Sequence, residues 1–71
     1  MSQFSFSVRR TIPPEDLQAI LNIGKSVNQH VRFGIEPQFS TLVVTFRYDN
    51  DAQAYLFHER LLKSHIEFRE L

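Results

Sequence analysis

The chain has 71 residues, of which 42% are hydrophobic, and its eight basic and eight acidic residues give a formal net charge of zero. This length supports one hydrophobic core, so we expect a single small domain over residues 1–71. The neutral balance removes the bulk electrostatic attraction that draws basic proteins to nucleic acids or anionic membranes. With no cysteine there is no disulfide and no thiolate metal ligand, which fits a cytoplasmic protein. No run of about eighteen apolar residues is present, so no membrane association is expected.

The first predicted element is a strand over residues 3–10, because apolar and polar residues alternate there. Its inward side chains are Phe4, Phe6 and Val8, and its outward ones are Ser5, Ser7 and Arg9. A helix follows, starting at the two prolines 13–14 and ending between residues 24 and 28. Its apolar stripe consists of Leu17, Ile20, Leu21, Gly24 and Val27.

Two further strands are predicted over residues 31–36 and 41–48, separated by a short turn. In the first, Val31, Phe33 and Ile35 share one face, and Arg32, Gly34 and Glu36 share the other. In the second, Leu42, Val44 and Phe46 are expected to face the core, with Thr41, Val43, Thr45 and Arg47 outside.

A second helix is predicted over residues 51–65, capped by Asp49 or Asn50. Its predicted buried stripe consists of Ala54, Phe57 and Leu61, with Tyr55 and Leu62 as additions. The last predicted element is a strand over residues 66–71, with Ile66 and Phe68 inward and Glu67 and Arg69 outward.

The order of these elements is strand, helix, strand, strand, helix, strand. Right-handed crossovers and a hairpin between the middle strands then predict an α+β domain that resembles the ferredoxin-like fold. Its four-stranded antiparallel sheet has the order 4-1-3-2, and both helices lie on one face. Because this plan serves many functions, function has to be argued from particular residues.

The residues give little support to catalysis or to base stacking. RNA-recognition domains of similar topology place aromatic residues on the open sheet face, whereas the outward positions here are Ser5, Ser7, Thr41, Val43 and Thr45. His58 and His65 are seven residues apart, too far for a metal pair on one helix. There is no cysteine and no G-x-S-x-G nucleophile motif. We therefore expect neither enzyme activity, nor a metal site, nor a cofactor.

The predicted topology brings three arginines together in one charged cluster. Arg32, Arg47 and Arg69 are predicted at the same end of the open sheet face, where their planar guanidinium groups would bind an anion. The alternative is that nearby carboxylates of Glu36, Glu67 and Glu70 neutralise them. The sequence leaves both interpretations open.

The function that fits these observations is a small interaction or regulatory module, such as an adaptor or inhibitor. It would bind a protein partner, or itself as a homodimer, through an edge strand or through the open face at Ser5, Ser7, Val43 and Thr45. Phe39, in an otherwise polar turn, is a candidate anchor. Small size alone suggests a phage or mobile-element origin. The alternatives are nucleic-acid binding by the arginines and small-ligand sensing of the kind found in ACT-like domains.

Overall fold

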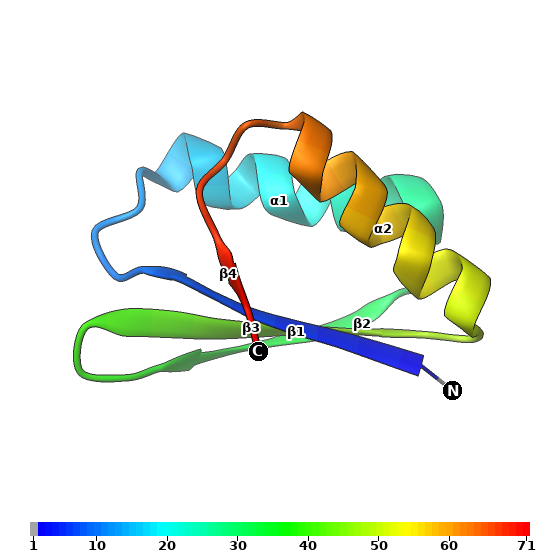
Figure 1. Cartoon of the computed structure of the whole chain (residues 1–71), viewed down its shortest axis with the longest axis horizontal. Helices are drawn as coiled ribbons and strands as arrows, with labels where there is room; N and C mark the ends of the chain where they lie inside the picture. The colour runs from blue at the N-terminus through cyan, green and yellow to red at the C-terminus, as the bar shows by residue number, and fades with distance from the viewer. Residues whose placement is uncertain (1) are drawn as a thin grey trace.

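The computed structural model describes residues 2–71 and contains the six predicted elements in the predicted order (Figure 1). They are β1 (Ser2–Arg9), α1 (Pro14–Val27), β2 (Arg32–Pro37), β3 (Thr41–Tyr48), α2 (Asp51–Lys63) and β4 (Arg69–Glu70). The strands form one antiparallel sheet in the order β2-β3-β1-β4. Read from the other edge this is the predicted order 4-1-3-2, so the ferredoxin-like α+β fold is confirmed.

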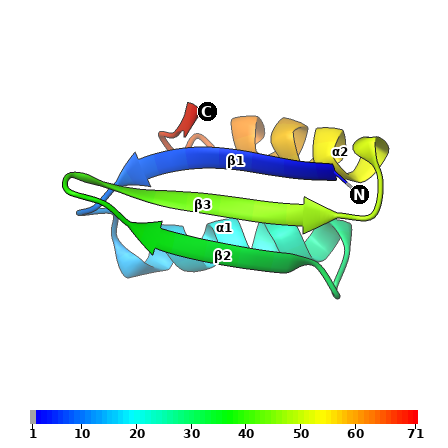
Figure 2. The same cartoon turned by 90° about the horizontal axis from the view of Figure 1, so that it is seen from below.

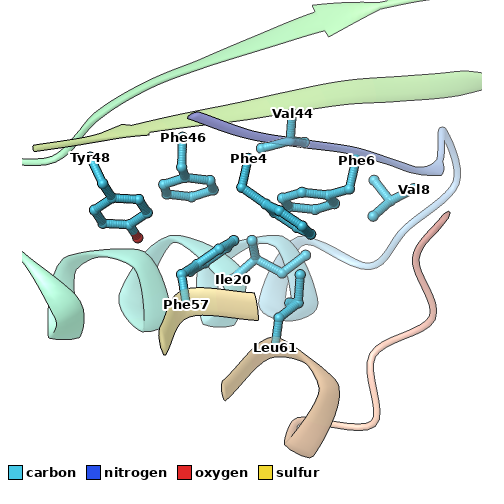
Figure 3. Packing of buried hydrophobic residues seen from close by; sticks show 9 residues of the cluster. All are labelled: Phe4, Phe6, Val8, Ile20, Val44, Phe46, Tyr48, Phe57 and Leu61. Carbon is cyan, nitrogen blue, oxygen red and sulfur yellow. The ribbon is translucent and has the colours of Figure 1, made fainter. Parts of the chain in front are cut away.

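Both helices cover one face of the sheet and leave the other face open (Figure 1). Seen from the open face, α1 lies behind β2 and β3, and α2 lies on the β1 side (Figure 2). The alternation of each strand sends every second side chain toward the helices, where apolar burial stabilises the fold. The buried core consists of Phe4, Phe6, Val8, Ile20, Val44, Phe46, Tyr48, Phe57 and Leu61 (Figure 3).

Gly24 allows α1 to pack closely against β3. A Cβ atom at this position would overlap the ring of Phe46, so any larger residue must displace a packed ring. The Gly24 carbonyl also accepts a hydrogen bond of 3.0 Å from the hydroxyl of Tyr48, a core residue only 1% exposed. Burial raises the pKa of Tyr48 well above its usual range, and the nearby charge of Arg60 offsets this in part. Tyr48 therefore remains a neutral hydrogen-bond donor.

Helix α2 ends at Lys63, two residues before its predicted end, and its buried stripe is narrower than predicted. The placement of Tyr55 and Leu62 in that stripe is wrong, because both side chains are exposed. At about 100° per residue, Tyr55 points nearly opposite to the buried Phe57. The predicted cap is confirmed at Asn50, whose side chain accepts a hydrogen bond from a main-chain N–H of the first turn. Over residues 2–71, neither helix has the length and apolar character needed to cross a membrane.

Strand β4 is much shorter than the strand predicted over residues 66–71. It contains only Arg69 and Glu70, which pair with the middle of β1. The preceding segment leaves α2 in the helix layer and has to descend to the sheet, as Figure 1 shows. Pairing therefore begins only at Arg69. Ile66 and Phe68, predicted to point inward, pack against the core on the way down.

Candidate functional site

On the open face of the sheet, residues that pair across the strands form rows. The rows that concern the site are Gln3–Arg47–Arg32, then Ser5–Thr45–Gly34, then Arg69–Ser7–Val43–Glu36. The predicted contact residues of β1 and β3 therefore form one continuous patch at the centre of this face. The hydroxyl oxygens of Ser5 and Thr45 are 3.0 Å apart and hydrogen-bond to each other. This leaves the centre of the open face weakly polar, and its role in binding stays a prediction.

Arg32 and Arg47, here called the arginine pair, lie directly opposite each other on β2 and β3. Both are exposed. Like charges in directly opposed positions disfavour strand pairing, so this arrangement costs the single chain some stability. Neither guanidinium forms an ion pair within residues 2–71. The pair thus presents uncompensated positive charge at one end of the open face.

The three glutamates that the sequence offered as alternative partners are engaged or placed elsewhere. Oε1 of Glu67 lies 3.2 Å from Nε of Arg9, and Oε1 of Glu70 lies 3.5 Å from Nε2 of His58. Glu36 lies on the same strand as Arg32 but two rows away from the arginine pair. Neutralisation of the arginine pair by these carboxylates is therefore not observed.

Arg69 does not join the arginine pair, so the prediction of three clustered arginines is wrong. It pairs with Ser7, four residues along β1 from Gln3, which is the neighbour of Arg47. At a rise of about 3.3 Å per residue, this separates the two rows by about 13 Å. Arg69 lies there because the segment before β4 descends from the helix layer and reaches the sheet only at the middle of β1. Arg69 instead lines a second hollow, of about 660 Å³, near Arg9 at the other end of β1.

A hollow of about 390 Å³ lies on the open face of β2 and β3, with Gly34 in its lining. The arginine pair borders one end, and Glu36 and Val43 border the other. A Cβ atom at Gly34 would meet no atom of residues 2–71 within 4 Å, and the φ of Gly34 is not positive. The single chain therefore does not require glycine here. Glycine inside a strand weakens it and often marks the close approach of a ligand or another backbone.

The outer edge of β2 carries main-chain groups that β3 does not bind. Pro37 has no N–H, so its pair with β3 cannot exchange hydrogen bonds, and beside it the N–H of Gln38 donates to the carbonyl of Thr41 at 2.8 Å. Hydrogen-bonded and non-hydrogen-bonded pairs alternate along an antiparallel ladder. The N–H and C=O groups of Phe33 and Ile35 therefore point away from β3, out of the sheet.

The side chains of Phe33 and Ile35 are the exposed apolar part of the same edge. Both point to the helix side, because they pair with the core residues Phe46 and Val44. They nevertheless remain 43% and 36% exposed. We call these two residues and their outward main-chain groups the β2 edge. The opposite edge of the sheet, β4, has only two residues, and both are charged.

The remaining predicted residues lie apart from this edge. Phe39 is 98% exposed at the tip of the β2–β3 hairpin, at the far end of these strands from the arginine pair. The ring of His58 stacks on Phe4, with centroids 4.6 Å apart. Within residues 2–71, no three histidine or acidic side chains gather in a way that could hold a metal ion.

The sequence predicts an edge strand as one possible contact surface but does not distinguish β2 from β4. The signal was present in the segment RFGIEP, where Gly34 and Pro37 interrupt an otherwise alternating pattern. Both residue types are avoided inside central strands, and proline is tolerated at edges. What the sequence could not supply is the position of β2 relative to the helices, which leaves Phe33 and Ile35 exposed.

No model of a known protein family matches this sequence, and no curated protein matches it. Among solved structures, the de novo designed protein Foldit4 is similar in fold, with a TM-score of 0.61 and 18% sequence identity. The match covers 97% of this chain and 91% of the designed chain. At this level of identity the likeness concerns the fold alone.

Proposed function

We propose that this protein is a small, non-enzymatic interaction module of the cytoplasm whose β2 edge accepts an additional strand from a protein. The observation that carries the proposal is the outward orientation of the main-chain groups of Phe33 and Ile35, next to their exposed side chains. A strand added to such an edge gains main-chain hydrogen bonds, and its alternate side chains contact the apolar residues. Docking therefore requires no cavity and no catalytic group.

The contrast with the other sheet edge supports this proposal. Proteins protect free edges by making them short or charged, and β4 is both. β2 has six residues, and its helix-side positions are apolar.

The hydroxyl groups of the open face support a non-enzymatic role. The side chains of Ser5 and Thr45 hydrogen-bond to each other rather than to a side chain that could act as a general base.

The test is site-specific photo-cross-linking of the full chain in cells, with the cross-linking residue placed at Gln38, next to the β2 edge. We expect a discrete cross-linked protein species that disappears with Ile35→Pro. Because the Ile35 N–H points away from β3, this proline blocks strand addition without removing a hydrogen bond between β2 and β3. Phe39→Ala, at the hairpin tip, is the matched control and should retain the product. A product that persists with Ile35→Pro, or no product at all, would contradict the proposal.

A second candidate function is binding of a phosphate-rich ligand such as single-stranded nucleic acid. It is favoured by the arginine pair, which borders the hollow beside Gly34 and has no carboxylate partner within residues 2–71. Fluorescence anisotropy with a labelled oligonucleotide should then show binding that falls steeply with salt and weakens with Arg47→Ala. Arg69→Ala serves as the control, because Arg69 lies away from the pair. An affinity independent of salt would remove this candidate.

A further inference from the structure

We propose that the strand accepted by the β2 edge belongs to a second copy of this chain. The two copies are related by a two-fold axis at Gly34, so that their sheets join into one continuous antiparallel sheet. This inference deepens the proposed function and rests on it. It names the partner and fixes the register of the contact.

The register follows from the sequence of β2 read against itself. With Gly34 opposite Gly34 of the partner subunit, Phe33 lies opposite Ile35 of the partner subunit, and Arg32 lies opposite Glu36 of the partner subunit. Two-fold symmetry repeats each pair in the reverse sense. Directly opposed residues of an antiparallel sheet share a face, so the apolar pairs lie on the helix side and the charged pairs on the open side.

The main-chain groups match this register. Phe33 and Ile35 both point their N–H and C=O groups outward, so each exchanges two hydrogen bonds with its opposite residue in the second copy. The next two residues of β2 and its flank that face outward are Val31 and Pro37, and neither has an N–H group that still lacks an acceptor. The N–H of Val31 already donates to the carbonyl of Asn28 at 3.0 Å, and Pro37 has no N–H. The joined ladder therefore ends without an unpaired donor at either side.

The charges match as well. In the single chain Arg32 faces only Arg47, and Glu36 forms no ion pair within residues 2–71. Joining the edges places the Glu36 carboxylate of the partner subunit on the other side of Arg32. Opposite charges in directly opposed positions favour strand pairing. A shift of the register by two residues in either direction loses both of these ion pairs, so charge selects the register centred on Gly34.

Gly34 itself is accounted for by the axis. It pairs with β3 through hydrogen bonds, so across the axis it forms a non-hydrogen-bonded pair, whose Cα atoms lie only about 4.5 Å apart. Glycine in both copies leaves no side chain between the two hollows, and a glycine inside a strand often marks the close approach of another backbone. The open space around Gly34 in the single chain shows no competing reason for glycine.

The first test measures the mass of the purified full chain by sedimentation equilibrium over a range of concentrations. We expect a monomer–dimer equilibrium for the natural sequence, and at least about tenfold weaker dimerisation for Arg32→Glu or Glu36→Arg alone, since each variant opposes like charges. An equimolar mixture of the two variants should dimerise again, because both opposed pairs then carry opposite charges. Circular dichroism of each variant confirms folding. A mixture that stays as weak as its components would overturn the register.

The second test uses the absence of cysteine from the chain. Gly34→Cys should form an intermolecular disulfide under mild oxidation, because the Cα separation at the axis lies within the range for disulfides. Thr45→Cys is the matched control. It lies in the same row but one strand further in, about 14 Å from its copy at a spacing of about 4.8 Å between strands, so it should remain reduced. Equal cross-linking of both variants would contradict the arrangement.

The outcomes separate this inference from the proposed function. If the natural chain is monomeric at every concentration while the Gln38 cross-link to another protein is lost with Ile35→Pro, the second copy is wrong and the interaction module stands. If the chain is monomeric and no edge-dependent cross-link forms, both are wrong. A concentration-dependent dimer with charge-swap rescue supports both.

Discussion

Strands β2 and β3 belong to one hairpin and show the same alternation of apolar and polar residues, yet their inward side chains differ in burial. The inward side chains Val44 and Phe46 of β3 are fully buried, whereas Phe33 and Ile35, paired directly with them on β2, remain 43% and 36% exposed. β3 lies between two strands, and its Phe46 lies against Gly24 of α1 and Phe57 of α2, whereas β2 lies at the edge of the sheet. Alternation therefore determines the face of a side chain, and position in the sheet determines whether anything covers it.

The same comparison separates residues that hold the fold from residues available for binding. β3 contributes to packing through Phe46 and through the hydroxyl of Tyr48, which reaches Gly24 on α1. Among residues 2–71, β2 pairs with a neighbouring strand on one side only. The following predictions test this division from the largest expected effect to the smallest.

Truncation of paired phenylalanines should give very different results on the two strands. Phe46→Ala should lower the free energy of unfolding by about 3–5 kcal/mol, which for a domain of this size comes close to complete unfolding. Phe33→Ala, measured by urea denaturation at low protein concentration, should cost about 1 kcal/mol or less, since Phe33 is partly exposed. Similar losses for both would contradict the proposed division.

Close packing of α1 on β3 should make Gly24 intolerant of a methyl group. Gly24→Ala should destabilise the domain by about 1–3 kcal/mol, because the added Cβ overlaps the ring of Phe46. Gly34→Ala is the matched control on β2 and should leave the stability of the monomer unchanged or slightly raised, because its Cβ meets open space. Thermal unfolding followed by circular dichroism distinguishes the two.

The buried phenol of Tyr48 predicts a loss of stability at high pH. Its pKa is raised in the folded state, so above the ordinary tyrosine pKa of about 10 the unfolded chain loses the proton while the folded chain retains it. The contribution of Tyr48 to the free energy of unfolding is fully present below about pH 10. Above that pH it decreases by up to about 1.4 kcal/mol per pH unit. Tyr48→Phe should remove this contribution of Tyr48 from the free energy of unfolding measured by urea titration at successive pH values. Tyr55→Phe should retain it, although a hydrogen bond to Glu59 raises the pKa of the exposed Tyr55 as well. If the free energy of unfolding falls equally steeply with pH in the natural chain and in both variants, Tyr48 is not the source of the loss.

Proline should distinguish the two sides of β2. Gly34→Pro removes an N–H that pairs with β3 and should cost more than about 1 kcal/mol. Ile35→Pro removes an outward N–H and should cost clearly less in the monomer, as Pro37 is already accommodated at an equivalent position. Denaturant midpoints of the two variants provide the measurement, and the reverse order would show that the assigned orientation of β2 is wrong.

The sequence was sufficient for the fold because its local signals agree with one another. Alternation placed the β1 and β3 side chains on the correct faces, and the cap at Asn50 located the start of α2. The errors arose where geometry between elements decides the outcome. Arg69 was misplaced because the length of the descent from α2 to the sheet is not encoded in a local pattern.

The candidate site was only partly predictable for the same reason. The sequence identified Arg32 and Arg47 and the small residues of the open face, and these do lie together. It could not show that Phe33 and Ile35 stay exposed, since their pattern is that of any half-buried strand. The predicted order 4-1-3-2 already places this strand outermost, and Gly34 and Pro37 are the local signs of an unusual edge, but no local pattern shows how much of the edge the helices leave uncovered.

The measurement that tests the central claim most directly is amide hydrogen exchange of β2, followed residue by residue by NMR at low and high protein concentration. The N–H of Gly34 should be protected at both concentrations, because it pairs with β3. The N–H groups of Phe33 and Ile35 should exchange freely in dilute samples and become protected as the concentration rises and the second copy binds. Free exchange of both groups at every concentration would contradict pairing of the β2 edge with a second copy.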